Sequence, residues 1–130
     1  MHDLSDWNVL IVDDEPDNRG VLEFVLTSYD AAVRTASTGQ QCLQMMEAEK
    51  PTLLLADIQM AGMSGMELLV KVRENEQWKD IPVIAITAFA MPGDRERILA
   101  AGFNGYISKP LSVMRLVDQI QELIAEKANP

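Results

Sequence analysis

Four short apolar runs in this chain each end in side chains that can take part in chemistry. Asp13 and Asp14 follow the first of these runs, and Asp57 follows the second. Thr87 and Lys109 come at the ends of the last two. If the runs are parallel strands, their carboxyl ends share one edge of a sheet, where open α/β proteins bind ligands. Three carboxylates, a hydroxyl and an ammonium are then expected in one crevice.

The charges in this crevice call for a cation. Two carboxylates ~4 Å apart repel by about 4 kcal/mol at an effective dielectric constant of ~20, and a third adds to this. Lys109 offsets only part of the repulsion. Mg²⁺ suits the rest, because it takes one or two carboxylates, keeps several waters and leaves room for a phosphoryl oxygen. Asp57 is then placed as a nucleophile toward phosphorus, which predicts an aspartyl phosphate. Mg²⁺, Lys109, Thr87 and backbone N–H groups would position the phosphoryl group.

The elements that must position these groups alternate between strand and helix patterns. Three runs are apolar at every position, as in strands buried on both faces of a parallel sheet: 9–12, 53–56 and 83–86. Weaker strand candidates are 31–36 and 106–108. Helical patterns separate them, and the last, over 116–124, is amphipathic. This order predicts an α/β, flavodoxin-like (βα)₅ fold with a central five-stranded parallel sheet, strand order 2-1-3-4-5 and right-handed crossovers.

Local signals predict where some helices begin and end. Ser64 and Glu67 have the spacing of a capping box, in which the two side chains bind each other's backbone N–H groups. Pro92 suits the first turn of the following helix. Gly102 is expected just past the end of that helix, where a left-handed backbone is common.

Length and composition favour one soluble domain. The 130 residues are predicted to form a single domain with a core over about residues 8–125. Eleven basic and twenty acidic residues give a formal charge of −9, which argues against binding nucleic acid directly. The single cysteine, Cys42, can form neither an internal disulfide nor a multi-cysteine metal site. Without a signal-peptide pattern or an apolar run of ~20 residues, we expect a cytoplasmic protein that does not insert into membranes.

Four motifs in order along the chain are similar to those of one known family. They are Val12-Asp13-Asp14-Glu15, Asp57-Ile58-Gln59-Met60 followed by Met63-Ser64-Gly65, Ile86-Thr87-Ala88, and Tyr106-Ile107-Ser108-Lys109-Pro110. Together they resemble the receiver domains of response regulators, particularly single-domain members of the chemotaxis and cell-cycle type. The likeness extends from about Asn8 to the last helix.

The resemblance implies a role for each residue around the metal. Asp14 and Asp57 would bind Mg²⁺ directly, with the backbone carbonyl of Gln59 as a further ligand. Asp13 would act mostly through water. Asp57 would accept a phosphoryl group from a phosphohistidine on a sensor histidine kinase or a histidine phosphotransfer protein.

The resemblance also implies a switch. Lys109 would contact the phosphoryl group, and its bond to Pro110 would be cis. Thr87 would move toward the phosphoryl oxygen, and Tyr106 would turn inward to fill the space. The face formed by the fourth helix, fifth strand and fifth helix would carry this change to a downstream protein. Ala88 is small, as access to the phosphoryl group requires. Such a protein is a phosphorylation-dependent signalling switch rather than an enzyme, although it assists its own phosphorylation and slow dephosphorylation.

The loop after Asp57 departs from the family in one place. Ala61 stands where the family usually has proline, which predicts a less rigid loop and altered switching or turnover rates. Gln59 and Phe89 occupy positions that, in the family, tune the lifetime of the phosphoryl group.

Other interpretations stay open at the level of sequence. Taken singly, Asp13 and Asp14 could be solvated surface carboxylates, Lys109 an exposed turn residue, and Tyr106 a packing residue. A phosphatase resembling the haloacid dehalogenases also uses a strand-end aspartate, but it has a second acid two residues later, where this chain has Gln59. A nucleotide-binding Rossmann domain would need a glycine-rich turn after the first strand. A receiver used as an unphosphorylated scaffold would not need the full acidic and lysine set.

Overall fold

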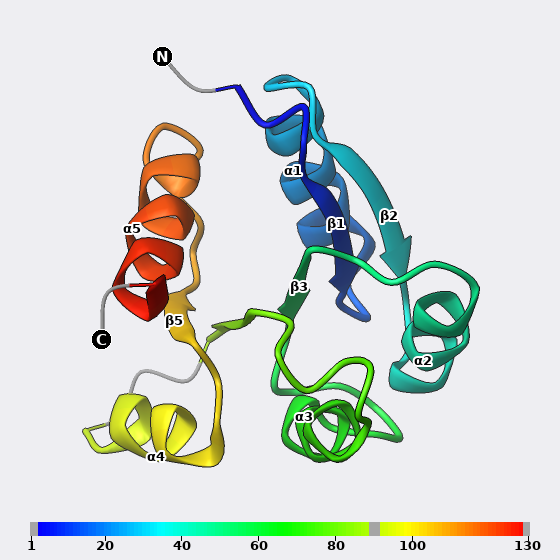
Figure 1. Ribbon diagram of the computed structural model, residues 1–130. Helices are drawn as coiled ribbons and strands as arrows, with labels where there is room; N and C mark the ends of the chain where they lie inside the picture. The colour runs from blue at the N-terminus through cyan, green and yellow to red at the C-terminus, as the bar shows by residue number, and fades with distance from the viewer. Residues whose placement is uncertain (1–2, 89–91, 129–130) are drawn as a thin grey trace.

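Strands and helices alternate along the chain in the computed structural model, which describes residues 3–88 and 92–128 (Figure 1). The strands are β1 (Asn8–Val12), β2 (Ala32–Ala36), β3 (Leu53–Ala56), β4 (Val83–Thr87) and β5 (Gly105–Ser108). The helices are α1 (Pro16–Thr27), α2 (Gly39–Ala48), α3 (Gly65–Glu74), α4 (Asp94–Ala101) and α5 (Leu116–Ala128). The strands are parallel and lie in the order β2-β1-β3-β4-β5, which confirms the predicted α/β fold.

The apolar strands are those with neighbours on both sides. Every residue of β3 and β4 is buried, and β1 is buried from its second residue to its last. β2 lies at one edge of the sheet and is fully buried only at Ala36. β5 lies at the other edge and alternates between more and less buried residues. The weaker sequence signals of β2 and β5 therefore follow from their edge positions.

Helices cover both faces of the sheet. On one face, α1 and α5 pack through residues such as Leu22 and Ile120. On the other face, α2, α3 and α4 pack through residues such as Met46, Leu68 and Ile98. Both layers are mainly aliphatic, so the core is built as the scarcity of aromatic residues predicts. The second layer also contains Cys42 and Trp78. Burial raises the pKa of the Cys42 thiol to about 12, which disfavours the reactive thiolate at neutral pH.

The helix ends agree with two of the three predictions. Ser64 and Glu67 form the capping box, with the Glu67 N–H donating to Ser64 Oγ at 3.2 Å. Gly102 follows α4 with a left-handed backbone, φ 117°. The prediction for Pro92 is wrong, because α4 begins at Asp94. Gly93 stands between them with φ 91°, and this left-handed residue keeps Pro92 outside the helix.

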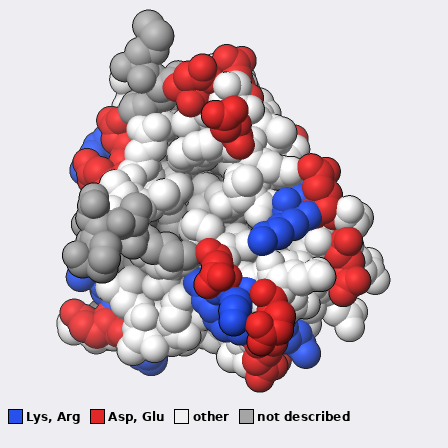
Figure 2. All heavy atoms as spheres, in the orientation of Figure 1, with Lys and Arg blue, Asp and Glu red and all other residues white. Residues whose placement is uncertain are grey.

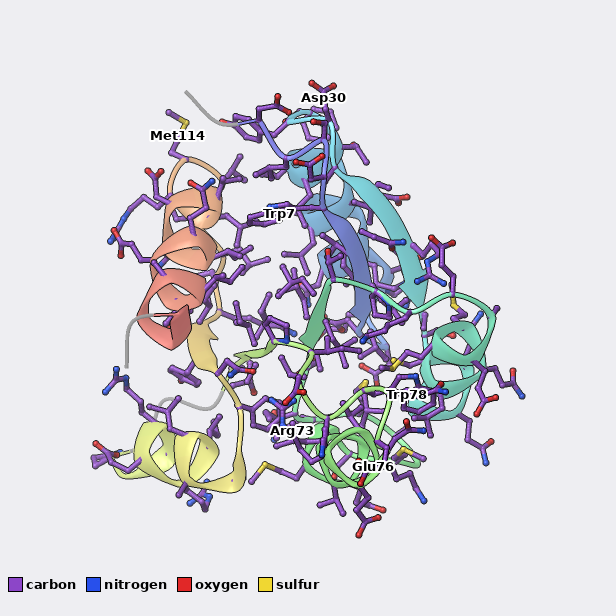
Figure 3. The ribbon with its side chains drawn as sticks, viewed as in Figure 1. Trp7, Asp30, Arg73, Glu76, Trp78 and Met114 are labelled. Carbon is purple, nitrogen blue, oxygen red and sulfur yellow. The ribbon has the colours of Figure 1, made fainter. Side chains whose placement is uncertain are left out.

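A partly buried guanidinium connects the segments that lead into β4 and β5. Arg73, which projects from α3 (Figure 3), donates to the carbonyl oxygens of Ile81 and Gly102 at 2.7 and 2.9 Å. It also donates to Asn104 Oδ1 at 2.8 Å, and the same oxygen accepts a bond from the Val83 N–H at 2.7 Å. This network fixes the starts of the two strands whose far ends carry functional side chains.

Acidic side chains dominate the charged surface, in line with the formal charge of −9. On the face drawn in Figure 2, most of the described basic side chains lie beside acidic ones rather than in a continuous stripe. A protein that binds a phosphate backbone needs clustered Lys and Arg, so this face is not suited to nucleic acid. Within the described part of the chain, no helix combines the length and the apolar character that a bilayer crossing requires.

Candidate functional site

Two buried carboxylates lie side by side at the carboxyl ends of the central strands. Val12 of β1 pairs with Ala56 of β3, so the next residue of each strand is an aspartate at the same level. The Asp57 N–H donates to the Val12 carbonyl at 3.0 Å, which extends the ladder to the site. Asp13 is 1% exposed and Asp57 is 4% exposed. The parallel register of β1 and β3 therefore brings two buried carboxylates together at the carboxyl ends of these strands.

A third carboxylate completes an acidic cluster. Asp13, Asp14 and Asp57 each offer a carboxylate oxygen, and these atoms all lie within 4.8 Å of one another. Asp14 is exposed, unlike the other two. Its Oδ2 accepts a hydrogen bond of 3.1 Å from the backbone N–H of Ala61, in the loop between β3 and α3. The cluster thus has two buried members and one that faces solvent.

Lys109 neutralises part of this cluster. Its Nζ lies 2.8 Å from Asp57 Oδ2 and 3.2 Å from Asp13 Oδ2, with Glu15 Oε1 at 3.8 Å. The residue follows β5, and its backbone N–H donates to the Thr87 carbonyl at 2.9 Å. The Lys109–Pro110 peptide bond is cis, as predicted. Carboxylates from the segments after β1 and β3 therefore converge on one ammonium, and the backbone of Lys109 is bonded to the end of β4.

The electrostatics are those of a site with surplus negative charge. Burial raises the pKa of Asp13, and the charge of Asp57 raises it further, against a hydrogen bond from Glu15 N–H and the charge of Lys109. Burial by itself lowers the pKa of Lys109, but its hydrogen bond to Asp57 and the charges of Asp13 and Asp57 outweigh this, so its pKa is raised. Lys109 is a cation at neutral pH, and one ammonium faces three carboxylates.

A tight loop holds Asp57 in place. Asp57 Oδ1 accepts a hydrogen bond of 3.1 Å from the Gln59 N–H, which closes a turn of the loop on its own aspartate. The Gly65 N–H donates to the Ile58 carbonyl at 2.9 Å. A Cβ atom on Gly65 would lie 2.3 Å from the Asp57 carbonyl oxygen, so only glycine permits this approach. Both carboxylate oxygens of Asp57 thus meet a fixed donor.

This acidic cluster with its lysine, on a sheet of this strand order, is what the four motifs predict for one family. Residues 9–121 match the family described as the response regulator receiver domain. The chain belongs to the response-regulator receiver family.

Similar proteins agree with this assignment. This chain is 38% identical over 120 residues to the polar-differentiation response regulator DivK of Brucella abortus. The aligned region covers 92% of this chain and 97% of DivK. Among solved structures it is similar to the chemotaxis response regulator CheY4 of Vibrio cholerae, with a TM-score of 0.83 and 27% identity over 88% of this chain and 96% of that one. The receiver domain of NtrX from Brucella abortus gives a TM-score of 0.82 at 25% identity, over 91% and 98% of the two chains.

The residues predicted to act as a switch lie on β4 and β5 of the receiver. Thr87 ends β4 and is fully buried. Tyr106 is opposite Ala85 in the strand pairing, and both belong to the layer that contains α4. Since alternate residues of a strand point to the same face, Thr87 also points toward that layer. Tyr106 is partly buried, and its pKa is raised by burial and by the charge of Asp94 at the start of α4.

The donor set of the receiver fits a hard divalent ion. The cluster supplies three carboxylate oxygens from three residues and no nitrogen or sulfur ligand, which suits Mg²⁺ better than zinc or copper. The surplus negative charge, which Lys109 does not balance, gives such an ion a strong electrostatic reason to bind. The Gln59 backbone lies directly beside Asp57, held by the bond that its N–H donates.

Some contacts of the site were not predicted from sequence. Arg19 of α1 donates from its guanidinium to the Asp13 carbonyl oxygen at 2.6 Å, which fixes the backbone between the two acidic residues and the helix. Its position one turn into α1 is the only signal in sequence, and arginine at such a position usually faces solvent. The bond from Ala61 to Asp14 gives no sequence signal, because the donor is a backbone group. Phe89, expected to tune phosphoryl lifetime, lies outside the described residues.

Proposed function

We propose that Asp57 is the phosphoacceptor of a phosphorylation switch in a two-component system. Proteins of the receiver family interact with histidine kinases and with downstream targets, and the phosphoryl group would come from a phosphohistidine on a sensor kinase or a phosphotransfer protein. The observation that carries the proposal is the Lys109 ammonium 2.8 Å from a carboxylate oxygen of an almost fully buried Asp57. A buried aspartate beside a lysine and two further carboxylates is what an activated phosphoacceptor requires.

The transfer would exchange one bond to phosphorus for another. An Asp57 carboxylate oxygen attacks phosphorus, the P–N bond to the donor histidine breaks, and the imidazole leaves with its electron pair. Lys109 stays protonated because of its raised pKa, so it offsets phosphoryl charge and does not act as a base. In slow dephosphorylation, water attacks phosphorus, the bond from phosphorus to the Asp57 oxygen breaks, the carboxylate is restored, and inorganic phosphate leaves with the water oxygen and its proton. Backbone N–H groups of the loop after Asp57 would help to orient the phosphoryl oxygens.

We also propose that the acidic cluster holds Mg²⁺. Asp14, Asp57 and the Gln59 carbonyl would be direct ligands, and Asp13 would act mainly through a bound water. When bound, the ion would neutralise charge on the phosphoryl oxygens and on the carboxylates. The exposed position of Asp14 supports this division, because the ion must keep several waters and admit a phosphoryl group.

The output would be a change in the face formed by α4, β5 and α5. Thr87 ends β4 at the level of the site, and Tyr106 lies on the neighbouring strand facing the same layer. Phosphorylation adds about −1.5 to −2 charges at neutral pH, which would draw the Thr87 hydroxyl toward the phosphoryl group. Tyr106 would then turn into the space that Thr87 leaves. A downstream protein would recognise the new surface.

The phosphodonor would dock on an apolar surface beside the site. We call this surface the α1 patch, and its exposed members are Val21, Phe24, Val113 and Met114. Phe24 is 73% exposed and Met114 is 90% exposed, and Met114 points outward in Figure 3. A hollow of about 490 Å³ lies between α1 and the segment before α5. The patch is continuous with the site, since α1 starts just after Asp14 and Val113 follows Lys109 by four residues, so an apolar helix carrying a phosphohistidine fits it.

The family assignment supports three broader inferences. We infer that residues of about 8–125 act as one receiver domain, that the protein works in the cytoplasm, and that it is not an enzyme for an external substrate. The formal charge of −9 also argues against direct binding of nucleic acid.

Labelling with a small phosphodonor tests the proposal. The protein is incubated with acetyl phosphate, with Mg²⁺ or with EDTA, and its intact mass is measured. We expect one added phosphoryl group, stable in acid and labile in alkali, that depends on Mg²⁺ and is absent in Asp57→Asn. The matched control is Asp118→Asn, on α5, which should label like the wild type. Equal labelling of Asp57→Asn and wild type would refute the proposal.

A further inference from the structure

The three carboxylates of the site are held in different ways. Asp13 and Asp57 are buried, and each contacts Lys109 and a backbone N–H of its own loop. Asp14 is exposed, and its side chain has a different support. Within residues 3–88 and 92–128, the hydrogen bond to the Asp14 carboxylate comes from the backbone N–H of Ala61, at 3.1 Å from Oδ2. A side chain from β1 is thus held by the loop that follows β3.

That loop is itself fixed at both ends. After Ala61, Gly62 has φ 76°, a left-handed backbone that glycine adopts without strain. A Cβ atom on Gly39 would lie 2.7 Å from Met63 Sδ, so this part of the loop packs closely on the start of α2. Further on, Gly65 packs against the Asp57 carbonyl oxygen. The Ala61 N–H is therefore presented to Asp14 from a fixed position.

The residue type at position 61 decides whether this donor exists. The family that this chain resembles usually has proline at this position. Proline has no backbone N–H, so it cannot make this bond. Ala61 gives up the stiffness of proline and gains a donor for Asp14. In this loop, a backbone hydrogen bond to Asp14 therefore takes the place of the rigidity that proline would give.

We propose that Ala61 is a positioning residue for the metal site, whose backbone N–H holds the Asp14 carboxylate toward Asp13 and Asp57. This role rests on the proposed Mg²⁺ site. The bond uses one lone pair of Oδ2 and leaves the other lone pairs of the carboxylate for a cation. An exposed side chain that is already oriented loses less conformational freedom when the ion binds. The bond also links the loop between β3 and α3 to the occupancy of the site.

Isothermal titration calorimetry with Mg²⁺ on the full chain tests this role. Ala61→Pro lacks the N–H, whereas the control Ala61→Ser keeps it. We expect Ala61→Pro to bind Mg²⁺ about three- to tenfold more weakly than wild type, the usual worth of one hydrogen bond, and Ala61→Ser to stay within about twofold. In an Asp14→Ala background, Ala61→Pro should have no further effect. Unchanged affinity in Ala61→Pro, or an equal loss in both backgrounds, would overturn the role of Ala61.

A measurement on the metal-free protein keeps the test decisive if Ala61→Pro does not fold. In ¹⁵N–¹H NMR spectra without metal, Asp14→Ala should shift the Ala61 amide proton upfield and speed its exchange, while the amide of Gly20 in α1 stays in place. An unshifted Ala61 amide would also overturn the proposal. Failure of the wild type to bind Mg²⁺ is a different result, because it refutes the proposed metal site and with it the purpose of the contact.

Discussion

Replacing Asp13 with Asn tests whether a buried, ionised carboxylate costs stability in the metal-free protein. Its carboxylate has an oxygen within 4.8 Å of one on Asp57 and one on Asp14. At an effective dielectric constant of ~20, one such repulsion is about 3.5 kcal/mol, and the attraction to Lys109 at 3.2 Å is about 5 kcal/mol. Because Asp14 is exposed, solvent screens part of its repulsion. The charge terms that Asp13→Asn removes therefore nearly cancel.

Desolvation then decides the sign of the effect. Asp13 is 1% exposed, and a buried carboxylate loses far more hydration than an amide does. The raised pKa of Asp13 leads to the same conclusion. Above that pKa the ionised carboxylate lowers the free energy of unfolding, and this loss disappears as pH falls through the raised pKa. We expect Asp13→Asn to increase the free energy of unfolding by about 1–2 kcal/mol at neutral pH in EDTA.

Urea denaturation followed by circular dichroism measures this, in EDTA and in Mg²⁺. Mg²⁺ at a hundred times its Kd should stabilise the wild type by about 2.7 kcal/mol, and Asp13→Asn by less, because it binds the ion more weakly. The control Glu76→Gln removes an acid from an exposed ion pair with Lys79 and should change stability by at most about 0.5 kcal/mol. A variant that is less stable in EDTA, or that gains as much from Mg²⁺ as the wild type, would refute the reasoning.

Three further predictions concern stability and docking. Because the pKa of Lys109 is raised above its ordinary value of 10.5, the stability that it contributes is lost only as pH rises through the raised pKa. The difference in unfolding free energy between wild type and Lys109→Met should therefore stay constant from about pH 7 to about pH 10, and a decline within that range would contradict this. Gly65→Ala should destabilise the protein by about 2–3 kcal/mol in thermal melts, because the added Cβ would meet backbone atoms. The control Gly20→Ala, whose Cβ would have no heavy atom within 4 Å, should stabilise the protein by up to about 1 kcal/mol. Equal effects of the two variants would contradict the packing argument. Phe24→Ser should slow phosphoryl transfer from a phosphohistidine donor about tenfold and leave labelling by acetyl phosphate unchanged. The control is Val70→Ser, another exposed apolar residue, which should transfer at the wild-type rate. An equal loss of transfer rate in both variants would exclude a specific role for the α1 patch.

The fold could be predicted from sequence because three strands are buried on both faces. A run such as Leu53–Ala56 has no polar residue, and this pattern identifies central strands of a parallel sheet without further information. The limits of β2 and β5 were less clear, since edge strands are partly exposed. The start of α4 was misjudged at Pro92, because the left-handed Gly93 that excludes it from the helix cannot be distinguished from any other glycine by type alone.

The acidic cluster was predictable for a related reason. Asp13 and Asp57 follow strands that pair in register, so their meeting is a consequence of the strand order. Their contact with Lys109 follows from the same rule, because Lys109 follows β5, two strands further along the sheet from β3. The support of Asp14 was not predictable, because a backbone N–H donor depends on the path of a loop and not on the residue type. The exposure of Phe24 likewise depends on which face of α1 meets the sheet.

A crystal structure with Mg²⁺ and the phosphoryl analogue beryllium trifluoride tests the central claim most directly. The claim is that carboxylates from β1 and β3 hold one divalent ion beside the acceptor. We predict the analogue on an Asp57 oxygen, with the ion bound by Asp14, Asp57 and the Gln59 carbonyl and the Lys109 ammonium at the analogue. A structure with the analogue on another carboxylate, or with the ion away from both Asp14 and Asp57, would contradict the account.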